Sequence, residues 1–357
     1  MENQEVLRSK PLSYEASKAV LKSLKLETRE AINRRIPALR TVNSRLPYVL
    51  ENVRIGAKSF QTNGREWFMR PVWVQSSENL LRQVEDPEKW ELILQFNEGK
   101  EICYRMNKSR EEIWYHLFDE YVQSGTVVRG SLRFSGIPEC MKGIRENEKD
   151  LKMKVTNLEL GIYGTKDFDQ FIRFIDLDVL ENVRIMSFRN SLTLLDNPEI
   201  QNCKNLTIYS RYLGRPTNLS IDLFLRLRNQ HLKLENIGFP LHELQLFVQD
   251  WITTGRDIGT RLSWRRLQSE DILSILEHLK THLGAVEAGS HLDYYFSNKT
   301  IHGKGITLKM GEDRELVMYC GKNNIDSEWE IEYVWVFEME VVASTIAAGT
   351  VPIPMPI

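Results

Sequence analysis

The stretch that decides the fold runs from residue 206 to residue 253 and contains LTIY (206–209), SIDLFLRLR (220–228), LKLENI (232–237) and LHELQLFVQDWIT (241–253). The first and third segments alternate apolar and polar residues, which is typical of strands with one buried face. The second and fourth have helical spacing; Leu244, Phe247, Val248 and Trp251, for example, fall on one side of a helix. Strands and helices therefore alternate here in units of roughly 25 residues.

The same alternation continues on both sides of this stretch. We expect strands at 155–162 and 183–188, with a helix at 167–175 between them, and a further helix at 270–283. Such units resemble a leucine-rich-repeat-like ladder, although the chain has no strict repeat motif. Beyond them, segments 305–310, 315–319 and 328–342 are separated by turn residues and predict a C-terminal antiparallel meander.

Three short helices are expected at the start of the chain. Ser13 is a candidate N-cap for the first, which places Val20, Leu21 and Leu24 on one face. The second runs from about residue 27 to residue 35, and Pro37 suits the first turn of the third. Each helix is too short to be stable alone, so the three must pack together or on a partner.

Residues 47–145 have a mixed character. Turns are indicated at Thr62-Asn63-Gly64 and at residues 97–100. Ser109 and Glu112 form a capping-box pattern at the start of a helix that reaches Tyr121, and a strand follows at 127–134. The charged run from 139 to 150 is the best candidate boundary. The sequence thus predicts an α+β protein with a helical segment at 1–46, a mixed region at 47–145, and the ladder, meander and a disordered tail at 146–357.

Charge and composition exclude several classes of protein. The 357 residues carry a net charge of −2, which argues against whole-protein attraction to nucleic acid, although residues 1–72 hold 14 Lys and Arg against 7 Asp and Glu. The four cysteines form no CxxC pair, and the N-terminus lacks an apolar signal region, so an intracellular, cytoplasmic or nuclear protein is expected. Residues 341–357 are uncharged but short and rich in proline, which predicts a frayed tail and no membrane partner.

No recognised catalytic motif is present. A phosphate loop, a GxSxG elbow and an HExxH sequence are all missing from the chain. His278 and His282, followed by His291, have the spacing of metal ligands on a helix, but no third ligand is evident and we interpret them as part of an ordinary solvated helix face. The carboxylates at positions 167, 169, 176, 178 and 181 suit either acid–base chemistry or helix ends. We therefore expect a non-catalytic protein without a cofactor or metal.

Several short segments, taken in order, resemble the nematode F-box C proteins. In the N-terminal part these segments are Pro11-Leu12-Ser13-Tyr14, Leu21 with Leu24, Arg35-Ile36-Pro37-Ala38-Leu39 and Leu46-Pro47. Further along they are Val155–Glu159, Asn197–Ile200 before Leu206–Ile208, Ile237, Trp251-Ile252, Gly255 and Ile258–Thr260. The similarity extends over roughly residues 10–340. Two features depart from the F-box pattern: Pro11-Leu12 inverts its Leu-Pro start, and no tryptophan precedes Trp67.

This resemblance implies a substrate-recruiting adaptor of an SCF-type cullin-RING ubiquitin ligase. The F-box-like helices would dock on the Skp-type adaptor subunit, and residues from about Pro47 onward would present a surface to a protein substrate. Residues at matching positions would be the buried contacts, namely Leu12, Leu21, Leu24, Ile32 and Leu39. The alternative is a stand-alone protein-binding module with no role in ubiquitin transfer.

Overall fold

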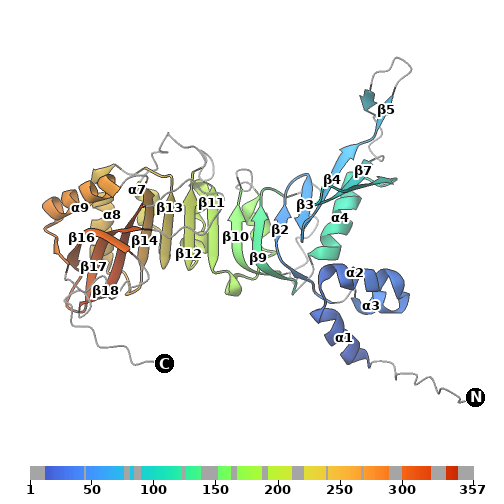
Figure 1. Ribbon diagram of the computed structural model, residues 1–357, viewed down its shortest axis with the longest axis horizontal. Coiled ribbons are helices and arrows are strands. Elements are labelled where there is room, and N and C mark those ends of the chain that lie inside the picture. The colour runs from blue at the N-terminus through green and yellow to red at the C-terminus, as the bar shows by residue number, and fades with distance from the viewer. Residues whose placement is uncertain are drawn as a thin grey trace, which may run out of the picture. The chain divides into compact units, whose positions relative to one another are not determined.

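The α+β class expected from the sequence is confirmed in the computed structural model (Figure 1). The structure describes residues 13–43, 46–75, 81–83, 90–122, 125–137, 152–161, 167–186, 192–210, 221–238, 240–266, 269–288, 300–322 and 335–344. The chain forms two compact units. Unit 1 comprises residues 1–158 and 166–180, and unit 2 comprises residues 159–165 and 181–357. The boundary expected near residue 146 lies outside the described residues.

Unit 1 begins with the short helices that the sequence predicts. They are α1 (Tyr14–Ser23), α2 (Leu26–Arg35), the 3-10 turn η1 (Pro37–Leu39) and α3 (Arg40–Asn43). The predicted cap of α1 is confirmed, because the Ser13 hydroxyl accepts a hydrogen bond from the Ala16 amide at 3.2 Å. Pro37 stands at the first position of η1, where its missing amide proton costs nothing.

The rest of unit 1 is a mixed sheet with one long helix. Its strands are β1 (Val49–Leu50), β2 (Val53–Ile55), β3 (Ser59–Thr62), β4 (Arg65–Pro71), β7 (Trp90–Phe96), β8 (Glu101–Met106), β9 (Val127–Phe134) and the first part of β10 (Lys154–Leu160), whose residues from Glu159 onward belong to unit 2. They lie in the order β10-β9-β2-β3-β4-β7-β8, and β1 also pairs with β9. Strands β5 (Trp73–Gln75) and β6 (Leu81–Gln83) form a separate ribbon.

Local sequence signals explain two features of unit 1. Asn63 and Gly64 both adopt positive φ, as the tight turn between β3 and β4 requires. The predicted capping box is also confirmed: Ser109 and Glu112 exchange hydrogen bonds of 3.2 and 3.0 Å at the start of α4 (Arg110–Tyr121). The short helix α5 (Phe168–Ile172) and the 3-10 turn η3 (Leu177–Val179) complete the unit.

Unit 2 contains most of the predicted ladder, whereas the expected strand at 155–162 is divided between the units and the expected helix at 167–175 lies in unit 1. Strands β11 (Asn182–Met186), β12 (Asn205–Tyr209), β13 (His231–Glu235) and β14 (Arg261–Arg266) pair in parallel and in continuous register. They alternate with η4 (Leu192–Asp196), α6 (Pro198–Gln201), α7 (Ile221–Leu225) and α8 (Leu241–Thr254). Strand β14 is absent from the sequence-based prediction. Three of its six residues are arginines, so it lacks the apolar run that is typical of a parallel strand.

The predicted C-terminal meander follows the ladder. β14 pairs antiparallel with β18 (Trp335–Ala343), which continues through β17 (Arg314–Lys322) and β16 (Thr300–Lys309) to β15 (Val286–Glu287). Helix α9 (Ser269–Leu283) packs on β14, β16, β17 and β18, and α8 packs on α7 and α9. Residues 341–343, expected in a frayed tail, instead belong to β18, because Val341 and Val342 are buried. Residues 345–357 of that tail lie outside the described residues.

Among the described residues, no helix is both long and apolar enough to cross a membrane.

Candidate interaction surface

Arg29 fastens the N-terminal helices to the rest of unit 1. This arginine of α2 is almost completely buried. Its guanidinium donates to the carbonyl oxygens of Asn43 (2.9 Å), Leu46 and Pro47 (2.8 Å), and also to the side-chain oxygen of Asn43. It lies 4.0 Å from the ring centre of Tyr48. Burial lowers the pKa of Arg29. One side chain therefore ties α2 to the end of α3 and to the segment that leads into β1.

Acidic residues of α2 make a second connection, to β4 and α4. The Arg65 guanidinium of β4 lies 2.6 Å from the Glu30 carboxylate and 3.6 Å from that of Glu27. The Tyr121 hydroxyl, at the end of α4, donates to the other Glu30 oxygen at 2.9 Å. The Arg65–Glu30 pair is largely shielded from solvent, so its orientation is better defined than that of an exposed ion pair. The helices of residues 13–43 therefore have a fixed position within unit 1.

The leucine and isoleucine residues expected to contact a Skp-type partner differ in how far they are exposed. Leu21 is only 2% exposed and packs inside the chain. Leu24, Ile32 and Leu39 remain partly exposed, and Leu12 lies outside the described residues. Burial of Leu21 means that this residue is unavailable to a partner while the helices keep this packing.

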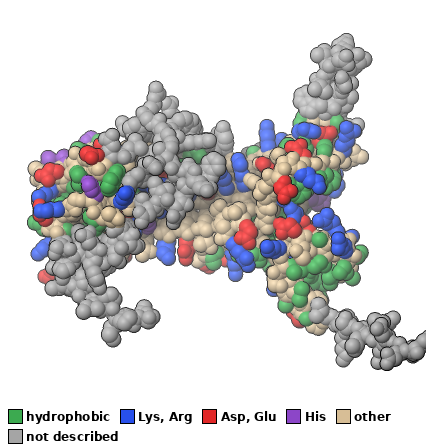
Figure 2. Space-filling view, viewed as in Figure 1, with side chains coloured by type: hydrophobic (Ala, Val, Ile, Leu, Met, Phe, Trp, Pro, Cys, Tyr) green, Lys and Arg blue, Asp and Glu red, His purple; other side chains and the backbone are tan. Residues whose placement is uncertain are grey.

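Other apolar residues in the same helices are more exposed. Tyr14, Val20 and Ile36 retain 51%, 43% and 46% of their accessible surface, respectively. Val20 was expected on the inward face with Leu21, but adjacent residues of a helix differ by about 100° in direction, and Leu21 alone points inward. Figure 2 shows hydrophobic side chains gathered over this part of unit 1. We call Tyr14, Val20, Leu24, Ile32, Ile36 and Leu39 the apolar helical surface.

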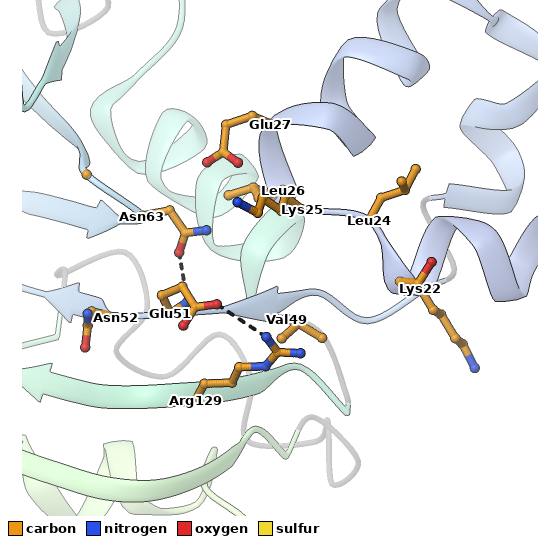
Figure 3. Close-up of a pocket in the computed structure, with 12 residues that line it drawn as sticks. Lys22, Leu24, Lys25, Leu26, Glu27, Val49, Glu51, Asn52, Asn63 and Arg129 are labelled. Atoms are coloured by element: carbon orange, nitrogen blue, oxygen red, sulfur yellow. Dashed lines mark hydrogen bonds and ion pairs between the residues drawn. The ribbon is translucent and has the colours of Figure 1, made fainter.

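A polar cavity of about 550 Å³ opens beside this surface. It lies where the α1–α2 connection faces the strands, and Lys22, Lys25, Glu51, Asn63 and Arg129 are among its lining residues (Figure 3). The Asn63 side-chain oxygen accepts the Glu51 amide at 2.9 Å, and Glu51 pairs with Arg129 at 3.5 Å. Because its wall carries both charge signs, the cavity suits a polar side chain of a partner better than an apolar one.

Unit 2 carries a different kind of surface on β11–β14. On one side of these strands the side chains are apolar and buried, as Leu206, Leu232 and Leu262 are. The residues that alternate with them are polar. We call this side the polar sheet face, and its main members are Arg184, Lys233, Glu235, Arg261, Ser263 and Arg265.

A hydrogen-bonded cluster lies at the edge of the polar sheet face, where β14 pairs with β18. Arg261 donates to both oxygens of the buried Glu338 carboxylate at 2.9 and 3.0 Å, and the Ser263 hydroxyl donates to the same carboxylate at 2.7 Å. The Nε2 atom of His231 lies 2.8 Å from that hydroxyl. Although serine, histidine and glutamate meet here, the carboxylate contacts serine directly, whereas a catalytic triad needs it to orient the histidine. We assign the cluster a structural role.

His231 is expected to make unit 2 less stable in mild acid. Burial, with smaller contributions from Arg261 and Lys233, lowers its pKa to about 4. The unfolded chain, with a pKa of about 6.5, therefore takes up the proton first as the pH falls. The contribution of neutral His231 to the unfolding free energy is therefore fully present above about pH 6.5, and it is lost as the pH falls toward 4.

This expectation is checked by urea unfolding of the wild-type protein and the His231→Gln variant across that pH range. The variant should show a smaller loss of unfolding free energy on acidification. Glu338 is present in both proteins, so its own titration cancels to first order. Equal pH slopes would contradict the assignment.

The structure gives hydrogen bonds or ring contacts for four of the other candidate chemical groups, His278, His282, Asp167 and Asp176. The rings of His278 and His282 stack with centroids 4.0 Å apart, and His282 Nδ1 bonds the His278 carbonyl oxygen at 2.8 Å. His291 lies outside the described residues, and the residues that are described contain no group of three metal-ligating side chains. Asp167 accepts the Ile137 amide at 3.0 Å, and Asp176 accepts the Asp178 amide at 3.3 Å.

Comparison with known proteins adds one match. Fold and surfaces together describe an α+β protein of two units, one with an apolar helical surface and one with a polar sheet face. A family model described as a domain of unknown function (DUF3557) matches residues 130–265, from within β9 to within β14. No curated protein and no solved structure matches the chain.

Proposed function

We propose that this chain is a non-catalytic interaction protein that acts as the substrate-recruiting adaptor of an SCF-type cullin-RING ubiquitin ligase. One observation carries the proposal: the helices of residues 13–43 are fixed to unit 1 through Arg29 and yet leave Tyr14, Val20 and Ile36 of the apolar helical surface exposed. The proposed partner of that surface is the Skp-type adaptor subunit. The ordered resemblance of the chain to the nematode F-box C proteins supports the same assignment.

The N-terminal helices combine a fixed position in unit 1 with exposed apolar side chains. Exposed apolar side chains that gather on one part of a protein surface commonly mark an interaction site. Amphipathic helices commonly bind by placing apolar side chains in a groove of the partner. Because α2 is already held by Arg29 and Arg65, little conformational entropy is lost when the partner binds. Such a surface needs no cofactor, in keeping with a non-catalytic role.

A stand-alone protein-binding module is the alternative, and one observation favours it. Leu21 and Leu26 are buried within the chain, so the helices already have an internal partner. In that case the helices are a structural element of unit 1, and a protein ligand binds elsewhere without a link to ubiquitin transfer.

Charged substitutions on the apolar helical surface are expected to abolish capture of the Skp-type subunit. In Val20→Asp and Ile36→Asp, an aspartate would have to be desolvated at the interface, which is strongly unfavourable. Both positions are exposed, so the free protein should fold normally. Co-purification from cells that express the tagged full-length chain measures the effect.

Thr28→Asp is the matched control, because Thr28 is an exposed polar residue of α2. It should leave capture unchanged. Leu21→Asp is unsuitable, since a charge at this buried position would disturb folding itself. If wild-type protein captures no Skp-type subunit but still captures another partner in all variants, the stand-alone module is the better description.

A further inference from the structure

We infer that the polar sheet face of unit 2 binds an acidic, extended segment of a protein partner. This inference deepens the proposed function and rests on it in one respect: the partner would be the recruited substrate. Three observations carry the inference, namely the pattern of the strands, the exposure of Lys233 and Arg184, and the balance of charge at the centre of the face.

The pattern of the strands is unusual for a parallel sheet. Parallel strands are ordinarily buried on both faces and consist of nearly continuous apolar runs. Strands β12 and β13 instead alternate strictly, with Leu232 and Leu234 buried on one side and Lys233 exposed on the other. An open parallel face of this kind is what stacked strand–helix units use as an extended binding surface. The alternation therefore indicates that this face contacts water or a partner and is not packed in a core.

The centre of the polar sheet face has an excess of positive charge. Glu235 is shared by two arginines, Arg184 at 3.2 Å and Arg265 at 3.4 Å. Lys233 stands between them, in register with Thr207 and Ser263, and within the described part of the chain it forms no ion pair. One carboxylate thus faces three cations. The Arg184 side chain remains 43% exposed, so this charge is accessible.

The borders of the face restrict where an acidic ligand can lie. Arg261 is neutralised by Glu338, and Glu340 is opposite Arg261 in the register with β18. At the other border, the Tyr209 hydroxyl donates to Glu159 at 3.2 Å. Carboxylates therefore flank the cationic centre on both sides. This arrangement favours a narrow, extended acidic segment over a broad acidic surface, which would meet repulsion at the borders.

Nucleic acid is the less suitable ligand for this face. Strong binding to a phosphate backbone needs a row of cations, each contacting one phosphate, and usually several aromatic platforms for bases. The described part of the face offers two well-exposed cations, Arg184 and Lys233, whereas the Arg265 side chain is only 17% exposed. The ring of Tyr209 is already covered by the Arg184 guanidinium at 4.4 Å.

The test measures binding of a fluorescein-labelled peptide of alternating glutamate and serine to the full-length protein by fluorescence anisotropy. Lys233→Glu should weaken binding by about tenfold or more, because an attractive contact becomes a repulsive one. Glu235→Gln should strengthen binding by a few-fold, since it removes the only carboxylate at the centre. Lys309→Glu, the same charge change at an exposed position of β16, should have no comparable effect.

Two outcomes would overturn the inference. The first is equal weakening by Lys233→Glu and Lys309→Glu, or no binding by the wild-type protein at low salt. The second is tighter binding of a single-stranded oligonucleotide of equal charge that is also lost in Lys233→Glu, which would make the face a nucleic-acid site. Capture of the Skp-type subunit by the Lys233→Glu variant separates the proposals, because it should persist whether or not the peptide binds.

Discussion

Replacement of Arg29 with methionine is expected to destabilise unit 1 by about 3–5 kcal/mol. The substitution keeps most of the side-chain volume but removes every donor that the guanidinium supplies. The carbonyl oxygens of Asn43, Leu46 and Pro47 would then lack the hydrogen bonds that they accept from Arg29. Each buried acceptor without a partner costs about 1–3 kcal/mol, and partial entry of water reduces the sum.

Arg34→Met provides the matched control, since Arg34 is an exposed arginine of the same helix. Its effect should stay within about 0.5 kcal/mol. Arg29→Lys should recover only part of the stability, because an ammonium group cannot reproduce the planar fork of donors. Urea unfolding measures the free energies, and hydrogen exchange of residues 13–43 shows whether the helices detach. Equal effects of Arg29→Met and Arg34→Met would contradict the anchoring role.

The elements predicted well from the sequence are those whose signals are local. The Ser13 cap, the Asn63-Gly64 turn and the Ser109–Glu112 capping box each depend on residues a few positions apart, and all are present in the structure. The alternation over residues 206–253 likewise indicates strands and helices without knowledge of their partners. These local signals are sufficient to predict the α+β class and the alternation of strands and helices in the ladder.

The features that the sequence does not reveal depend on distant residues. Strand β14 reads RLSWRR, and its arginines are understandable only once Glu235 and Glu338 are placed beside them. Arg29 looks like an ordinary surface residue of a basic helix, since its acceptors are backbone atoms that carry no sequence signal. The exposure of Ile36 follows from the same packing. Anchoring contacts and exposed surfaces of this type are therefore invisible to a pattern search.

Strand β14 also determines how unit 2 is held together. It is the last parallel strand of the ladder and the first partner of the antiparallel meander, so its inner face contacts both parts of the core. Trp264 occupies the centre of that face and is fully buried. Its indole Nε1 donates to the Ile237 carbonyl oxygen at 2.7 Å, and its ring meets the edge of Phe337 with centroids 6.3 Å apart.

Trp264→Ala is therefore expected to destabilise unit 2 by about 3–5 kcal/mol through loss of buried contacts and formation of a cavity. The Ile237 carbonyl would also lose its donor. Trp335→Ala is the matched control, because Trp335 of β18 is only partly buried and its described ring contacts are with His302 and Lys322. Its cost should be about 1 kcal/mol. Urea unfolding compares the two variants, and hydrogen exchange should show loss of protection in β13 and β14 for Trp264→Ala alone. Similar losses in both variants would mean that Trp264 does not join the ladder to the meander.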